Sequence, residues 1–251
     1  MTADAAAQPP KACADCRLRQ LTCFLPTTPA ELAFIQQCRE STPRVRAGRA
    51  IIAEHRASPR LFTLYSGWAF RYKTLADGRR QILNFLLPGD FVGLQGEFTD
   101  DATHGVEALT HTHLCAFGHD RLWDIFSRQA RLGYNVTWLC ASEEQLVDDN
   151  LVTVGRRNAA ERIAMLLIHL WRRAERLGLV DEQGGVEFPL TQQHIADALG
   201  LSLVHTNKTL SRLRERELCD WSDGRLRIIN LDAMARLGTT EREHPERRPL
   251  M

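Results

Sequence analysis

Three of the seven cysteines lie close together near the start of the chain, at Cys13, Cys16 and Cys23. A thiolate is both a nucleophile and a metal ligand. In a chain with no secretory signal, clustered cysteines are metal ligands, redox thiols or core residues more often than structural disulfides. A redox or metal role is one hypothesis for this turn, and ordinary thiols without a cofactor are the alternative. The cysteines predicted to be plain core residues are Cys38, Cys140 and Cys219.

A second group of chemically capable side chains lies on a predicted helix from Leu203 to about Glu217. Asparagine can pair with adenine, lysine can donate to guanine, and arginine neutralises phosphates. This mixture on one helix predicts DNA recognition, whereas the plainer interpretation is a hairpin of two helices with a solvated basic face. The candidate DNA-binding residues are Ser202, His205, Asn207, Lys208, Ser211, Arg212 and Arg214.

The flanking sequence predicts a helix-turn-helix that positions these side chains. Thr191 is a good N-cap for a helix over 192–199, Gly200 suits the left-handed residue beyond its end, and Ser202 caps the second helix. A turn over 221–225 between two short strands predicts a wing. Helix, tight turn and helix together send the second helix into the major groove of DNA.

The region from Arg44 to about Phe117 has a different pattern, with short apolar runs separated by turn residues. Asp77-Gly78 between two such runs is a hairpin signal. Many short strands at this spacing predict a β-barrel or jelly roll. A short amphipathic helix over 29–39 precedes it.

A long helix is expected over 119–154, interrupted only at Gly133 and ended by Gly155. Leu132, Leu139 and Leu146 recur every seven residues. Such a seam predicts pairing with a second copy of the chain, and the alternative is that it packs on the β-domain.

Composition sets limits on function. The net charge is +1, and no apolar stretch approaches the length of a membrane span. The N-terminus lacks the features of a secretory signal, so we expect a cytoplasmic protein that does not bind membranes. An enzyme is not expected, because no nucleophile–base pair stands out and the Cys13–Cys16 pair lacks a βαβ context.

The order of these elements resembles the Crp/Fnr family of bacterial regulators. The matching segments are 77–93, 155–163 and 190–210. The resemblance implies an α+β fold with an N-terminal β-roll (a jelly roll like cyclic-nucleotide-binding domains), a long dimerisation helix and a C-terminal winged helix-turn-helix. The expected divisions are 1–28 (disordered arm and cysteine-rich segment), 29–118 (β-roll sensor), 119–155 (dimerisation helix), 156–238 (DNA-binding domain) and 239–251 (disordered tail).

Two departures from the family bear on ligands. Members that bind cyclic nucleotides carry an Arg-Ser pair for the phosphate, whereas this chain has 102–105 (Ala-Thr-His-Gly) there, although Glu97 remains near the ribose position. We therefore expect no cAMP binding. Val204, Asn207 and Lys208 also replace the base-reading residues of the Fnr-like branch, which implies a different operator.

The Fnr-like branch further implies that Cys13, Cys16, Cys23 and Cys115 bind a 4Fe-4S cluster, with zinc or free thiols as alternatives. Asp149 matches an Asp of the dimer seam in that branch. The resemblance thus implies an oxygen- or redox-responsive regulator. Control by another small ligand or by thiol oxidation is the alternative. The expected partners are double-stranded DNA with an inverted-repeat operator, a second copy of the chain, and RNA polymerase if the protein is an activator.

Overall fold

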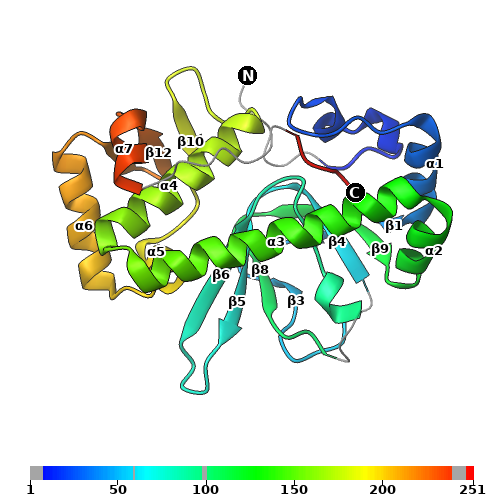
Figure 1. Ribbon diagram of the computed structural model, residues 1–251, viewed down its shortest axis with the longest axis horizontal. Coiled ribbons are helices and arrows are strands. Elements are labelled where there is room, and N and C mark those ends of the chain that lie inside the picture. The colour runs from blue at the N-terminus through cyan, green and yellow to red at the C-terminus, as the bar shows by residue number, and fades with distance from the viewer. Residues whose placement is uncertain (1–7, 59, 98–100, 239–246) are drawn as a thin grey trace. The chain divides into compact units, whose positions relative to one another are not determined.

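The computed structural model describes residues 8–58, 60–97, 101–238 and 247–251 (Figure 1). These residues belong to two compact units. The C-terminal unit contains the described residues of 74–84 and 147–238, and the N-terminal unit contains the rest.

The N-terminal unit is built on a β-roll of two antiparallel sheets, which confirms the predicted fold class. One sheet has the order β1-β9-β4-β7, with β2 also paired to β9, and the other has the order β3-β8-β5-β6. The strands are β1 Arg39–Ser41, β2 Arg44–Val45, β3 Ala50–Ile52, β4 Arg60–Ser66, β5 Ala69–Thr74, β6 Arg80–Leu86, β7 Phe91–Val92, β8 Gly105–Ala108 and β9 Thr112–Gly118.

Two apolar clusters stabilise this roll. Leu64, Val106 and Leu114 belong to one cluster, and all three are almost completely buried. The other cluster joins Leu61 and Phe117 to the helix α1 (Pro29–Cys38). α1 begins with a capping box in which Thr28 and Glu31 satisfy each other's backbone N–H groups. Cys38 is buried, as predicted.

The segment before α1 is ordered from residue 8, so the disordered arm, predicted for residues 1–12 ahead of the cysteine-rich segment, is wrong for 8–12; the first seven residues lie outside the described range. Two short 3-10 helices, η1 (Cys13–Asp15) and η2 (Arg17–Gln20), lie here. Cys13, Leu18 and Cys23 are buried, and the N–H of Cys13 donates to Gln36 Oε1 at 2.6 Å. Burial of these apolar groups offsets the entropy lost on ordering the arm.

The predicted disordered tail is also wrong at its end, because 247–251 are ordered within the N-terminal unit. Leu250 and Met251 are 4% and 6% exposed. The residues 239–246 lie outside the described range.

The expected single helix over 119–154 is two helices, α2 (Asp120–Arg128) and α3 (Ala130–Arg156). The break falls at Gln129, whose φ of −136° and ψ of 70° are not helical. Gly133 and Gly155 lie inside α3, so neither ends a helix. A Cβ on Gly133 would lie 2.8 Å from Phe126 Cδ1, which explains why a glycine allows α2 to pack closely here.

The C-terminal unit joins helices to a small sheet of order β10-β12-β11. The first of its helices begins with a capping box formed by Asn158 and Glu161. Within the described ranges, no helix is both long and apolar enough to cross a membrane. The elements are α4 Ala159–Arg176, β10 Gly185–Glu187, α5 Gln192–Leu199, α6 Leu203–Glu215, β11 Cys219–Ser222, β12 Arg225–Ile228 and α7 Leu231–Gly238.

Candidate DNA interface and thiol pocket

The helix-turn-helix forms as its capping residues predict. The Thr191 hydroxyl accepts a hydrogen bond from the His194 N–H at 3.2 Å, and Ser202 accepts one from the His205 N–H at 3.2 Å. Gly200 has a φ of 63°, the left-handed conformation that ends α5 and turns the chain into α6. The direction of α6 is thus fixed by local interactions.

The inner face of α6 carries Leu213, Thr206 and Thr209, all buried, and α6 packs against both α4 and α5. The two threonines stand where apolar residues are usual, and their burial places their methyl groups in the core. Thr206 Oγ1 is buried without a hydrogen-bond partner among the described residues.

The outer face of α6 presents Val204, Lys208, Ser211 and Arg212, all exposed. Lys208 lies four residues after Val204, and Ser211 and Arg212 lie three and four residues after Lys208, so the four share one face of the helix. Val204 is 79% exposed, which puts an apolar side chain beside the cations. Ser202 and His205 are exposed at the start of the helix.

Asn207 differs from the prediction that α6 exposes it. It is half-buried, and its Oδ1 is buried with no hydrogen-bond partner in the described part of the chain. Pairing with adenine needs both the oxygen and the nitrogen of the amide. Asn207 can therefore read a base only after its side chain rotates outward.

Arg214 contacts the wing, β11 and β12. Its Nη2 donates to the Trp221 carbonyl at 2.6 Å, and its Nε lies 3.3 Å from Asp220 Oδ1. Trp221 packs edge-on against Phe188 with ring centroids 5.3 Å apart. Arg214 thus holds the wing against α6, a role that the exposed pattern of the helix did not reveal.

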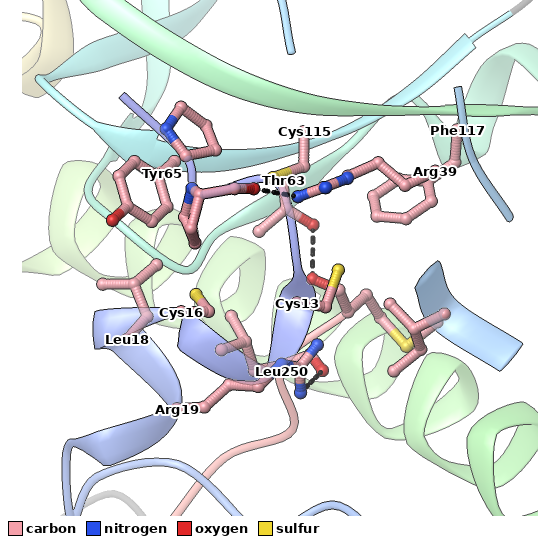
Figure 2. A pocket seen from close by; sticks show the side chains of 14 residues that line it. Cys13, Cys16, Leu18, Arg19, Arg39, Thr63, Tyr65, Cys115, Phe117 and Leu250 are labelled. Atoms are coloured by element: carbon pink, nitrogen blue, oxygen red, sulfur yellow. Dashed lines mark hydrogen bonds between the residues drawn. The ribbon is translucent and has the colours of Figure 1, made fainter. Parts of the chain in front are cut away.

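In the N-terminal unit, Cys13, Cys16 and Cys115 line one pocket (Figure 2). Cys115 comes from β9, about a hundred residues after the other two. Cys23 is buried but does not line this pocket. The cavity has a volume of about 20 Å³, room for about one water molecule.

Two guanidinium groups lie among these thiols. Burial raises the pKa of Cys115 to about 11, and the charge and hydrogen bond of Arg39 act in the opposite direction. Burial likewise raises the pKa of Cys13, against the opposing charges of Arg39 and Arg19. Positive charge is thus already present where thiolates would need it.

The donor chemistry of the pocket fits an iron–sulfur cluster, since three thiols converge beside two cations. The arrangement in this structure is not a complete cluster site, because Cys23 does not line the pocket. The described residues contain no group of three or more His, Cys, Asp or Glu arranged to hold a metal ion. Leu250 and Met251 fill space in the same pocket.

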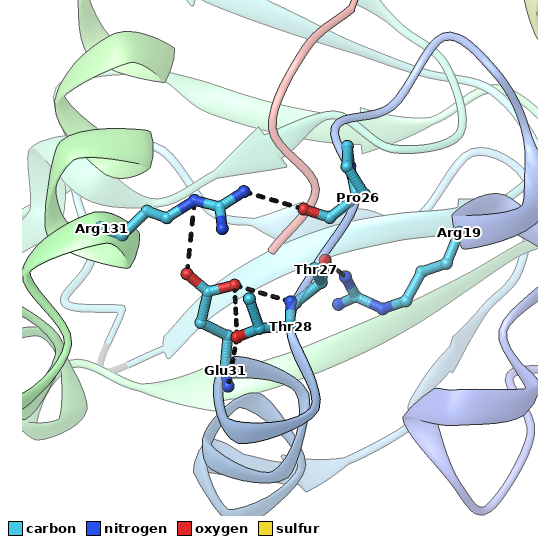
Figure 3. Close-up of polar contacts among 6 residues, drawn as sticks. All are labelled: Arg19, Pro26, Thr27, Thr28, Glu31 and Arg131. Carbon is cyan, nitrogen blue, oxygen red and sulfur yellow. Dashed lines mark hydrogen bonds and ion pairs between the residues drawn. The ribbon is translucent and has the colours of Figure 1, made fainter.

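The cysteine arm is tied to the first turn of α3 (Figure 3). Arg131 Nη2 donates to the Pro26 carbonyl at 3.0 Å, and its Nε lies 3.5 Å from Glu31 Oε1. Arg19, which lines the pocket, donates to Thr27 Oγ1 at 2.8 Å. A chain of polar contacts therefore joins the pocket wall to the start of the long helix.

The predicted seam of α3 is wrong at Leu132 and Leu139. They are 1% and 9% exposed, because they pack in the cluster of α1, α2 and the roll, so a second copy cannot reach them. Leu146 is half-buried and Asp149 is exposed.

The exposed apolar face of α3 is offset by one residue from that seam. Cys140, predicted to be a core residue, is exposed, and Val147 and Leu151 are 54% and 68% exposed. Spacings of seven and four residues place the three on one side of the helix.

The stretch over 102–105, where the family's phosphate-binding pair would stand, is buried at Ala102 and His104. Burial lowers the pKa of His104 to about 4, helped by the charges of Arg71 and Lys73. Sequence reasoning found no cation here and missed Arg71, which is 9% exposed. Arg71 pairs with Glu143 of α3, so its charge is already balanced.

Two family models match this chain: the cyclic nucleotide-binding domain over 42–129 and the Crp-like helix-turn-helix domain over 161–237. The transcriptional activator protein FnrL of Cereibacter sphaeroides is 29% identical over 204 residues, covering 80% of this chain and 81% of its own. The nitrogen fixation regulation protein FixK of Rhizobium meliloti is 32% identical over 192 residues, covering 74% and 82%. The solved structure of FixK2 from Bradyrhizobium japonicum has a TM-score of 0.70 at 24% identity, covering 78% of this chain and 96% of that one.

A β-roll joined to a winged helix-turn-helix with an exposed recognition helix defines a DNA-binding transcription regulator, not an enzyme. The chain belongs to the Crp/Fnr family. Regulators of this family bind DNA as dimers.

Proposed function

We propose that this regulator responds to oxygen or redox state through a 4Fe-4S cluster bound at the thiol pocket. The observation that carries the proposal is the convergence of Cys13, Cys16 and Cys115 from distant segments beside two guanidinium groups. Cys23 follows Cys16 on the same arm and is the fourth ligand in this proposal, which requires its loop to rearrange.

A bound cluster supplies an oxygen-labile group whose loss changes the charge and packing of the pocket. The residues of this chain have two tasks around it. Arg19 and Arg39 offset the negative charge of the thiolates, and Arg19 also donates to Thr27. Through Thr27, Glu31 and Arg131, a change at the arm alters what the first turn of α3 contacts.

Dimerisation through the exposed face of α3 completes the proposal. Val147 and Leu151 are apolar and exposed, as a helix seam requires. Asp149 lies two residues from both of them, which at 3.6 residues per turn puts it on the opposite side of α3, so it is not part of this seam. A change in the contacts at the start of α3 would then change the stability of the dimer.

Two recognition helices on a two-fold dimer read half-sites about 34 Å apart, so the proposed operator is an inverted repeat. Lys208 is placed to donate to guanine, and Asn207 contributes after its side chain rotates. RNA polymerase is the further partner if the protein is an activator. Cyclic AMP is not a proposed ligand, because Arg71, the buried cation near the altered phosphate stretch, is paired with Glu143.

The test is purification without air, followed by assay of iron and acid-labile sulfide. We expect about four iron and four sulfide per chain and a broad thiolate-to-iron absorption band. Cys115→Ser should lose the iron, whereas Cys38→Ser, a buried cysteine that does not line the pocket, should retain it. Iron-free, colourless wild-type protein would contradict the cluster.

Thiol oxidation without a cluster is the second candidate, because the same three thiols share one pocket. It predicts iron-free protein whose operator affinity still changes on oxidation of Cys13, Cys16 or Cys115. Iron content therefore separates the two candidates directly.

A further inference from the structure

The end of the described chain, Arg248–Met251, packs into the N-terminal unit. Its backbone lies beside the cysteine arm: the Arg248 N–H donates to the Cys23 carbonyl and the Leu25 N–H donates to the Arg248 carbonyl, both at 2.9 Å. Phe24 and Arg248 form a parallel bridge. This four-residue segment is called here the docked tail. Main-chain hydrogen bonds hold it beside the cysteine arm.

Arg248 anchors the docked tail at the turn after β6. Its Nη2 lies 2.6 Å from Asp90 Oδ1, and the Asp90 side chain is only 7% exposed. The guanidinium also lies over the Phe24 ring, 5.5 Å from its centroid. That ring sits so close to Gly89 that a Cβ there would lie 2.3 Å from Phe24 Cζ. The turn at Gly89 and Asp90 is thus shaped to receive both the arm and the tail.

The last two residues occupy the thiol pocket. Thr63 Oγ1 donates to the Met251 carbonyl at 2.9 Å, and Arg19 Nη1 lies 3.4 Å from the Leu250 carbonyl (Figure 2). Leu250 and Met251 line the same cavity as Cys13, Cys16 and Cys115. With them in place the cavity measures about 20 Å³, so no ligand much larger than water fits.

We propose that the docked tail is an intramolecular ligand of the thiol pocket, which must leave before a larger group can bind to these thiols. Where that group is the cluster, this inference rests on the proposed function. Binding at the pocket and docking of the tail then oppose each other, and the opposition is reciprocal.

Thiol alkylation tests the docking without any cluster. Iron-free, reduced protein is treated with N-ethylmaleimide, and the rate at each cysteine is followed by mass spectrometry. Arg248→Ala and Leu250→Asp should raise the rate at Cys115 by about tenfold, since the tail no longer covers it. Arg247→Ala removes the same charge from an exposed neighbour and should leave the rate unchanged.

Cys219, buried in the wing, reports unfolding and should stay protected in every variant. If Cys219 becomes reactive in Leu250→Asp, that variant is unfolded, and Arg248→Ala then tests the docking, because it deletes no buried apolar group. A wild-type rate at Cys115 in Arg248→Ala would overturn the docking.

Hydrogen exchange of 248–251 in iron-loaded protein tests the competition. We expect faster exchange than in the iron-free protein, and equal exchange would overturn the proposal. If the protein never binds iron but shows the alkylation effect, the cluster proposal is contradicted and the docked-tail proposal is supported.

Discussion

In the C-terminal unit the chemically capable side chains stand on the outside of a capped helix, whereas in the N-terminal unit they lie beneath other parts of the chain. Lys208 and Arg212 are exposed, so the proposed DNA interface needs no movement of these two side chains. Cys13 is buried, and Cys115 lies in a pocket that Met251 helps to fill. The proposed DNA contacts thus need only a preformed surface, whereas the proposed sensing needs a site whose occupancy changes the contacts of its neighbours.

The largest expected effect comes from the helix that joins the two units. Leu151→Glu puts a charge into the proposed seam and should give monomers, with operator affinity lower by on the order of 100-fold because only one half-site is bound at a time. Sedimentation and operator titration measure both. Leu75→Glu, at an exposed leucine in the connection between β5 and β6, is the control and should change neither. If the Leu151→Glu protein is still a dimer, the exposed face of α3 is not the dimer interface.

At α6 we expect a split between two kinds of contact. Lys208→Ala should cost about 1–3 kcal/mol on the cognate operator and little on random DNA, because it removes a base contact. Arg212→Ala should weaken binding to all sequences and reduce the slope of affinity against salt by about one. Competition titrations at several salt concentrations measure this, and equal losses for Lys208→Ala on both DNAs would contradict base reading.

Arg214 and Arg212 lie on the same helix but are expected to differ in their contribution to stability. Arg214→Ala removes its bonds to Asp220 and the Trp221 carbonyl, so it should lower the free energy of unfolding by about 1 kcal/mol. Arg212→Ala, for which no such contact is seen in the described residues, should leave stability within about 0.5 kcal/mol of wild type. Denaturant titrations compare them. Equal stability of the two variants would mean that the wing does not depend on Arg214.

The smallest effect is expected at the buried hydroxyl of Thr206. Its Oγ1 has no hydrogen-bond partner among the described residues, so Thr206→Val should raise the free energy of unfolding by about 1 kcal/mol. Thermal unfolding measures the gain, with Thr209→Val as the companion variant. A loss of stability would indicate that the hydroxyl binds an ordered water.

The sequence could predict the helix-turn-helix in detail because its determinants are local. Thr191, Gly200 and Ser202 lie within a dozen residues, and each acts on a backbone group a few residues away. The architecture of the roll could also be predicted, since short apolar runs separated by turn residues carry their own signal. β1 and β2 escaped prediction because they are very short and depend on pairing with β9.

The errors fell where the partner of a residue is far away in sequence. Leu132 and Leu139 have the spacing of a seam, yet the same spacing serves a helix that packs on the roll, and only the fold decides between them. Leu250 and Met251 carry no periodicity, so nothing local could show that Thr63 and Asp90 bind the tail. The convergence of Cys115 with Cys13 followed from family resemblance alone.

If the state of the thiol pocket controls binding to the operator, exposure to air must change operator affinity, and a titration measures this change. Operator affinity is measured for anaerobically purified protein before and after exposure to air, in wild type and in Cys115→Ser. We expect wild-type affinity to fall by at least about tenfold in air, a free energy change of about 1.4 kcal/mol. Cys115→Ser should give one affinity under both conditions. Wild-type protein that binds its operator equally well with and without air would contradict the account.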